Sequence, residues 1–253
     1  MMRKLLATAA LGALLLAGAP ASAQEETPLP HLGWSFDGIF GTYDRAAAQR
    51  GFQIYNEVCS NCHSLDLLTY GDLTDLGFTL DQVKAIAAAK QVPDTDDSGQ
   101  PIQRPALPSD HFVAPFPNVK AARAANNGAL PPDLSLMIKA REGGPDYVHG
   151  ILTGYVNAPS GFHLGDGMNY NEYFPGHQIA MPQPLSDNSV TFADGTPPLL
   201  DEEARDVVTF LAWAAEPRLE ERHRTGLKAV LFLIAMTGVL YGAKRRVWSD
   251  VEH

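Results

Sequence analysis

Cysteine is scarce in this 253-residue chain, which has only Cys59 and Cys62. Two cysteines three positions apart cannot cross-link distant loops, so the chain has no framework of structural disulfides, and the pair must act locally. Basic charge is also scarce, with 19 Lys and Arg residues against 29 Asp and Glu residues, which argues against a nucleic-acid-binding protein. The apolar share of 45% argues against a disordered chain, and the length allows one or at most two domains.

Residues 1–23 have the pattern of a secretory signal peptide. Arg3 and Lys4 precede an apolar stretch, and residues 21–23 read Ala-Ser-Ala, a small-residue cleavage site. A transmembrane anchor is the alternative, but the apolar stretch is short and ends at Pro20. We therefore predict that residues 1–23 are removed after export.

A second apolar run spans residues 226–243 and is interrupted only by Lys228 near one end. Its length is just sufficient to cross a bilayer, although a buried core helix of that length is the alternative. Three basic residues follow at 244–246, and Trp248 comes soon after them. Because basic clusters and interfacial aromatics mark the cytoplasmic end of a membrane span, we predict an anchor at 226–243 with residues 244–253 in the cytoplasm.

Together these segments predict that residues 24–225 form a domain in the periplasm, held at a bacterial inner membrane by a single pass through the lipid. This domain has 13 Lys and Arg residues against 27 Asp and Glu residues, a formal charge of −14. Such a field would steer a basic soluble partner toward the domain, although plain solubility is the alternative explanation.

Within the domain, helical patterns alternate with long loops. The helical patterns lie at residues 44–58, after a capping box of Thr79 and Gln82, at 133–143, at 145–156 and at 201–217. Residues 91–132 and 157–200 are rich in Pro, Gly, Asn and Asp and show no alternation that predicts a large sheet. We therefore predict a mainly α domain with long loop insertions, and wrapping around a large apolar prosthetic group would explain such loops.

Residues 59–63 read Cys-Ser-Asn-Cys-His, the C-x-x-C-H pattern of covalent haem attachment. Two thiols at this spacing can form thioether bonds to the two vinyl groups of one macrocycle, and the adjacent His63 becomes an axial iron ligand. A thioredoxin-like redox pair would require a surrounding βαβ pattern, and a zinc site would require more cysteines or histidines at matched spacing. We therefore predict one covalently bound haem c.

The second iron ligand is expected to be a methionine, because a thioether stabilises Fe(II) and raises the potential. Met181 is the best candidate, since Pro182 and Pro184 stiffen its loop. Met137 fits the apolar face of a helix, and Met236 lies in the predicted span. The remaining alternatives are Met168, His149, His163 and His177, of which the histidines would give a haem of lower potential. The 118 residues from His63 to Met181 exceed the spacing in a minimal class I cytochrome c and indicate a large insertion.

Seven segments of the mature chain carry a wider pattern. They are residues 50–63, 121–135, 152–155, 173–176, 178–184, 210–217 and 244–249. The C-x-x-C-H motif alone is generic, but the stretch Asn-Asn-Gly-Ala-Leu-Pro-Pro-Asp-Leu-Ser at 126–135, combined with the C-terminal anchor, is specific. On these residues nearly the whole mature chain resembles the cytochrome c1 family, the haem c subunits of the cytochrome bc1 complex (ubiquinol:cytochrome c oxidoreductase).

The resemblance implies a class I cytochrome c-like haem domain and a set of haem-binding positions. It implies that Cys59 and Cys62 bind the haem, that His63 and Met181 ligate iron, and that Arg141 pairs with a haem propionate. It places three residues in the wall of the haem pocket: Asn126, Pro132 and Tyr147. An exposed cation at a helix end is the alternative for Arg141, and a weaker second candidate for a propionate is Arg104.

Some bacterial members of the family have an additional disulfide in this domain. This chain has no other cysteines for such a bond, so we expect another contact to hold the methionine loop.

The resemblance also implies a redox subunit that is not catalytic alone. Single electrons would pass from a Rieske iron–sulfur protein to a soluble or membrane-tethered cytochrome c, and the chain would assemble with cytochrome b in a dimeric complex. One alternative is a free-standing, membrane-tethered cytochrome shuttle. A shuttle requires a flexible linker between the haem domain and the membrane, whereas residues 217–225 form a short, charged segment. Two others are a terminal-oxidase haem subunit, which would lack the 126–128 sequence, and a peroxidase-like enzyme, which requires an open iron or a second haem.

Overall fold

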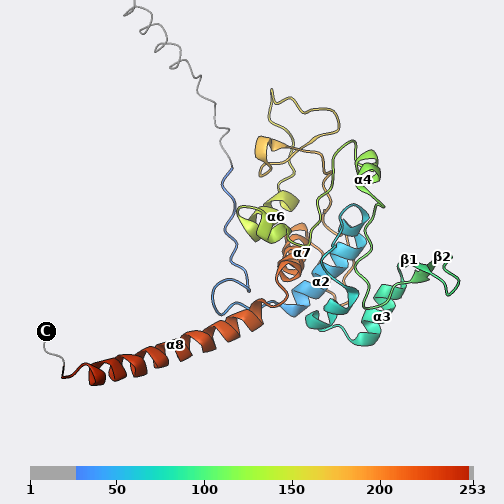
Figure 1. Cartoon of the computed structure of the whole chain (residues 1–253). Helices are drawn as coiled ribbons and strands as arrows, with labels where there is room; N and C mark the ends of the chain where they lie inside the picture. Colours follow the sequence, from blue (N-terminus) through green and yellow to red (C-terminus); the bar gives the residue numbers. More distant parts are fainter. Residues whose placement is uncertain (1–26, 251–253) are drawn as a thin grey trace, which may run out of the picture.

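Two packed helices form the centre of the domain in this computed structural model, which describes residues 27–250. Helix α2 (Arg45–Glu57) lies along α7 (Leu200–Ala215), as Figure 1 shows. Gly51 permits this approach, because a Cβ atom there would collide with the backbone of Asp206. The predicted signal peptide at residues 1–23 lies outside the described residues.

A buried ion pair joins the two central helices. The Arg50 guanidinium donates from Nε and Nη2 to both carboxylate oxygens of Asp206, at 2.6 and 2.8 Å. The Asp206 side chain is only 2% exposed, so this carboxylate depends on Arg50 for its counter-charge. The pair fixes the position of α2, and the haem-attachment motif begins directly after that helix.

The remaining helices surround this pair. Helix α3 (Leu80–Ala88) begins at the predicted capping box, in which the Thr79 hydroxyl accepts from the Gln82 N–H and the Gln82 side chain accepts from the Thr79 N–H. Helix α6 (Gly144–Thr153) matches the range predicted for it and packs on α7. The described residues also form the 3₁₀ turns η2 (Cys59–Asn61), η3 (Tyr70–Leu76) and η4 (Pro175–His177).

The helix predicted at 133–143 is much shorter in the structure, where only α5 (Met137–Ala140) is helical. The Asp133 carboxylate explains the difference, because it accepts hydrogen bonds from Ser64 Oγ and from the backbone N–H groups of Asp66 and Ser135. These bonds fasten residues 133–135 to the segment after the C-x-x-C-H motif, and the chain bends and turns there before α5 begins.

The two predicted loop segments contain short elements that the sequence analysis missed. Strands β1 (Gln91–Thr95) and β2 (Pro101–Pro105) pair antiparallel and form an arm that projects from the domain (Figure 1). Helix α4 (Val119–Ala125) follows, and β3 (Asn169–Tyr170) pairs with β4 (Gln178–Ile179). Proline and polar residues in these short strands hide the alternation by which a longer strand is recognised. The described residues contain no large sheet, as predicted.

The C-terminal helix α8 (Leu219–Val247) is one unbroken element of 29 residues. It is long and apolar enough to cross a membrane, and its apolar window is 0% buried. The short, charged segment at 217–225 is therefore helical from Leu219 onward and continuous with the predicted span. Leu219 is buried in the domain, and Glu220 accepts from the Tyr43 N–H, so the helix begins as part of the folded domain.

Candidate haem-binding site

The C-x-x-C-H motif forms one tight turn at the end of α2. The N–H groups of Cys62 and His63 both donate to the Cys59 carbonyl, at 3.1 and 2.9 Å, and this brings the three side chains into one turn. Both cysteines are free thiols. Burial raises the pKa of the Cys59 thiol to about 12, whereas a redox-active pair requires a thiol of low pKa. The turn therefore fits thioether attachment better than thiol–disulfide exchange.

The imidazole of His63 is oriented for metal binding. Its Nδ1 atom lies 2.7 Å from the Pro132 carbonyl oxygen, which can only accept, so Nδ1 carries the proton and Nε2 has a free lone pair. Burial lowers the pKa of His63 and favours the neutral ring that ligates metals. The Leu134 N–H donates to the Ser64 carbonyl at 2.9 Å and holds the Pro132 segment in place. These contacts fit an axial haem ligand.

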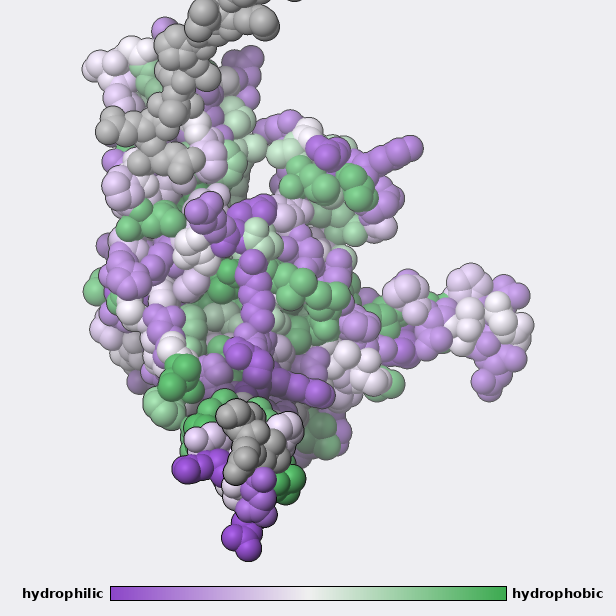
Figure 2. Space-filling view, turned by 60° about the vertical axis from the view of Figure 1, so that its left-hand side comes forward, coloured by the Kyte–Doolittle hydropathy of each residue, from purple (hydrophilic) through white to green (hydrophobic). Residues whose placement is uncertain are grey.

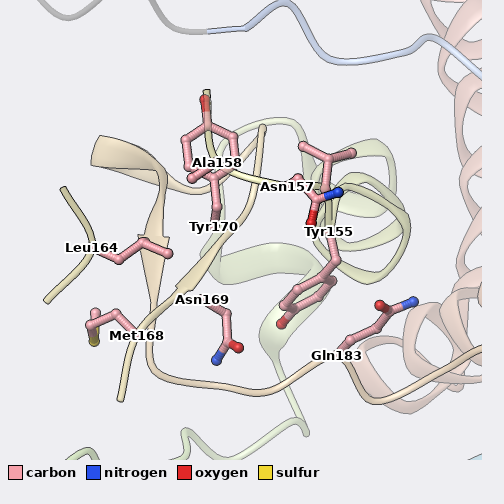
Figure 3. Close-up of a pocket in the computed structure, with 9 residues that line it drawn as sticks. Tyr155, Asn157, Ala158, Leu164, Met168, Asn169, Tyr170 and Gln183 are labelled. Atoms are coloured by element: carbon pink, nitrogen blue, oxygen red, sulfur yellow. The ribbon is translucent and has the colours of Figure 1, made fainter. Parts of the chain in front are cut away.

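Met181 lies in the loop after β4, and two side chains hold its backbone. The Met181 carbonyl accepts from the Tyr155 hydroxyl at 3.0 Å and from the Asn169 side-chain amide at 3.3 Å. Figure 3 shows both side chains projecting toward the chain that leads to Gln183. Sequence reasoning assigned no role to Tyr155 or Asn169, since a hydrogen bond to a backbone carbonyl 12 or 26 residues away leaves no local pattern.

Beside this loop is a cavity of about 430 Å³. Tyr155 and Asn169 line it together with Met168, the second methionine candidate, and with Tyr170 (Figure 3). Its lining contains neither Met181 nor any residue of the C-x-x-C-H turn, so the cavity adjoins the methionine loop and its supports.

Three further predicted residues lie on neighbouring elements. Arg141 follows α5 and is exposed, and its positive charge lowers the pKa of Tyr147 while the larger effect of burial raises it. The two side chains therefore lie close together. Asn126 ends α4, and its side-chain amide donates to the Ala122 carbonyl at 2.7 Å.

Comparisons with known proteins show the family of the chain. Residues 34–251 match the model of the Cytochrome C1 family. The chain belongs to the cytochrome c1 family. It is 44% identical over 265 residues to cytochrome c1 of Rhodospirillum rubrum, an alignment that covers 98% of this chain and 97% of the relative.

Two eukaryotic relatives extend the comparison. "Cytochrome c1, heme protein, mitochondrial" of Schizosaccharomyces pombe is 44% identical over 221 residues, covering 87% of this chain and 72% of the relative. "Cytochrome b-c1 complex catalytic subunit, mitochondrial" of Candida albicans is 43% identical over 241 residues, covering 94% and 84%. Membership of the cytochrome c1 family, the mainly helical fold and the long C-terminal helix are thus confirmed.

Arg104, the second candidate for a haem propionate, lies away from the other predicted site residues. Arg104 is part of β2 on the projecting arm, where its guanidinium pairs with the carboxylates of Asp94 and Asp110. Both carboxylates already neutralise its charge, so Arg104 is a structural residue of the arm and we do not retain it as a propionate partner.

The alternative histidine ligands also have other contacts. His149 is buried, its Nε2 atom lies 3.0 Å from an Asp201 oxygen, and its ring meets Trp34 edge-on. The ring of His177 stacks on Tyr170 at 5.4 Å, and His163 is exposed on a loop. Met181 therefore remains the best candidate for the second iron ligand, because hydrogen bonds from Tyr155 and Asn169 fix its backbone.

Proposed function

We propose that this chain is the haem c subunit of a cytochrome bc1 complex and passes single electrons from a Rieske iron–sulfur protein to a cytochrome c. The observation that carries the proposal is the C-x-x-C-H turn with its oriented His63, in a chain of the cytochrome c1 family. The Candida albicans relative is named as a subunit of the cytochrome b-c1 complex, which supports cytochrome b as a partner.

Each site residue has a defined task in this proposal. Cys59 and Cys62 would hold haem c through thioether bonds, and His63 and Met181 would ligate its iron. When bound, the haem supplies a one-electron Fe(III)/Fe(II) couple. The hydrogen bond from His63 to Pro132 fixes the orientation of the imidazole and increases its basicity as a ligand.

Other side chains complete the pocket. Tyr155 and Asn169 keep the methionine loop in position. Arg141 has an exposed guanidinium that is available to pair with a propionate. The proposed pocket wall includes Asn126, Pro132 and Tyr147.

The membrane arrangement follows from α8. Its 29 residues extend about 44 Å at the helical rise, more than the bilayer core of about 30 Å, so the first turns would stand above the lipid. In the proposal, residues 24–225 lie in the periplasm after removal of residues 1–23, the span at 226–243 crosses a bacterial inner membrane, and residues 244–253 lie in the cytoplasm.

The junction between domain and helix supports a subunit of a complex over a free-standing shuttle. Lys139 and Arg222 both pair with Glu216, and Arg45 pairs with Glu220 at 3.1 Å. These pairs, with the unbroken helix, leave no flexible linker on which a tethered haem domain could move between partners.

The deciding experiment is a reduced-minus-oxidised visible spectrum of the material that co-purifies with this chain from membranes in mild detergent. We expect b-type haem bands together with the c-type band. The variant Cys59→Ala/Cys62→Ala should lose the covalent c-type haem, whereas Ser60→Ala, within the same turn, should retain it. A c-type band alone from an intact preparation would contradict the bc1 assignment and favour the shuttle.

A further inference from the structure

A loop near the start of α8 presents two large apolar side chains to solvent. Ile39 is 73% exposed and Phe40 is 74% exposed, and no other large apolar residue of the described chain before α8 is as exposed. Figure 2 shows hydrophobic surface beside the base of the projecting helix. Exposure of two adjacent large apolar side chains is unfavourable in water, so the loop tip formed by Ile39 and Phe40 is expected to be covered by another molecule.

The loop is a built structure with fixed ends. The Asp37 N–H donates to the Trp34 carbonyl at 3.0 Å, and the Asp37 carboxylate accepts from the Trp34 N–H at 2.8 Å. Across the tip, the Gly41 N–H donates to the Gly38 carbonyl at 3.3 Å. A Cβ atom at Gly41 would collide with the backbone of Phe36, so the turn closes only with glycine there. Because the tip is already ordered, docking costs little further conformational entropy.

The loop is also locked to the first turns of α8. The Tyr43 N–H donates to Glu220 at 2.9 Å, and the Tyr43 hydroxyl donates to the carbonyls of Ala212 and Glu216. Phe36 and Gly38 line one pocket of about 320 Å³ together with residues of the first α8 turns. The loop and the base of α8 therefore form one unit.

This arrangement sets the height of the tip relative to the apolar part of α8. The apolar run begins at Gly226, six residues after Glu220, which is about 9 Å along a helix. Phe40 precedes Tyr43 by three residues, and three extended residues reach about 10 Å. In Figure 1 the loop lies beside the first turns of α8, on the side toward which the helix extends. The tip can thus reach the level at which α8 becomes apolar.

We infer that Ile39 and Phe40 insert into the interface of the lipid bilayer and form a second membrane contact beside α8. The inference rests on the proposed function, in which α8 spans the membrane. Apolar and aromatic side chains on a fixed turn match the boundary between headgroups and acyl chains. Arg218, Arg224 and Lys228 near the base of α8, set against Glu221, favour anionic headgroups there, whereas Arg222 is already paired with Glu216. Two contacts would fix the tilt of the haem domain above the membrane, which one helix alone does not.

The test is photo-crosslinking of the full chain in its native membranes. A photoreactive p-benzoylphenylalanine replaces Phe40, and mass spectrometry identifies what it captures. The matched control is the same replacement at Leu107, a 52% exposed residue after the projecting arm. A third replacement at Leu233, in the middle of the apolar run, tests the proposed span independently. An unchanged c-type spectrum shows that each variant is folded.

We expect phospholipid adducts at residues 40 and 233 and none at residue 107. An adduct between residue 40 and another protein subunit would overturn the inference and show a protein partner instead. No adduct at residue 40, with lipid captured at 233, would overturn the inference while leaving the span intact. No lipid adduct at 233 would overturn the proposed membrane span, and with it this inference.

Discussion

The hydrogen bonds to the Met181 carbonyl allow a quantitative test of what holds the methionine loop. Tyr155→Phe removes one donor at 3.0 Å and keeps the ring, while Asn169→Ala removes the other donor at 3.3 Å. A neutral hydrogen bond contributes about 1 kcal/mol, so each single variant should raise the population of the detached loop about fivefold. Removing both donors should raise it by about thirtyfold, near 2 kcal/mol.

The assay is binding of imidazole to the oxidised protein, followed in the visible spectrum. If Met181 ligates the iron as proposed, imidazole can reach the iron only where Met181 has left, so its apparent affinity rises in proportion to the detached fraction. Burial raises the pKa of Tyr155, so its hydroxyl stays protonated and remains a donor across the usable pH range.

The control is Tyr170→Phe, because Tyr170 lines the same cavity and its ring stacks on His177. Unchanged imidazole affinity in the double variant, or an equal increase in Tyr170→Phe, would refute the assignment of Tyr155 and Asn169 as the supports of the loop.

Four further outcomes test the site and the fold. Met181→Leu should lower the haem potential in a redox titration, and an unchanged potential would remove Met181 as a ligand. Higher salt should slow reduction of a basic cytochrome c, because the acidic domain steers it, and a salt-independent rate would exclude steering. Arg50→Gln leaves a nearly buried Asp206 unpaired and should cost about 3 kcal/mol in denaturant unfolding, whereas Lys84→Gln, in an exposed pair, should cost under about 0.5 kcal/mol. Burial lowers the pKa of His149, so on acidification the unfolded chain binds a proton at a higher pH than the folded chain does. The contribution of neutral His149 to the free energy of unfolding is therefore complete above about pH 6.5 and declines as the pH falls. His149→Gln should reduce that loss in thermal unfolding between about pH 7.5 and pH 5.5, and an identical acid dependence would show that His149 contributes nothing to it.

Local sequence patterns predicted the elements whose stabilising contacts are local. The α3 helix begins at the Thr79–Gln82 capping box because both partners lie within one turn. The predicted helix at 133–143 failed for the opposite reason, since the Asp133 carboxylate bonds to residues near position 65 instead of capping a helix. The pattern of residues within one segment cannot predict a hydrogen bond to a residue almost 70 positions away.

The candidate site divides in the same way. The C-x-x-C-H pattern could be read from the sequence because the proposed thioether attachment and iron ligation act within one turn. The apolar run of α8 could be read because its length and composition are those of a candidate membrane span. The supports of Met181 could not be read, since Tyr155 lies 26 residues and Asn169 lies 12 residues before it in the chain. The ion pairs of Arg104 span only six and ten residues, but they depend on the pairing of β1 with β2, which the sequence pattern did not reveal.

The sequence by itself therefore determined the kind of chemistry, the family and the long C-terminal helix, all of which depend on residue type and short spacing. Only the tertiary structure decided which side chains hold the methionine loop, that Arg104 is bound within the arm, and that the base of α8 is built into the domain beside the Ile39–Phe40 tip. The physical reason is that a hydrogen bond or ion pair depends on atoms a few ångströms apart, and for distant residues the folded backbone alone sets that separation.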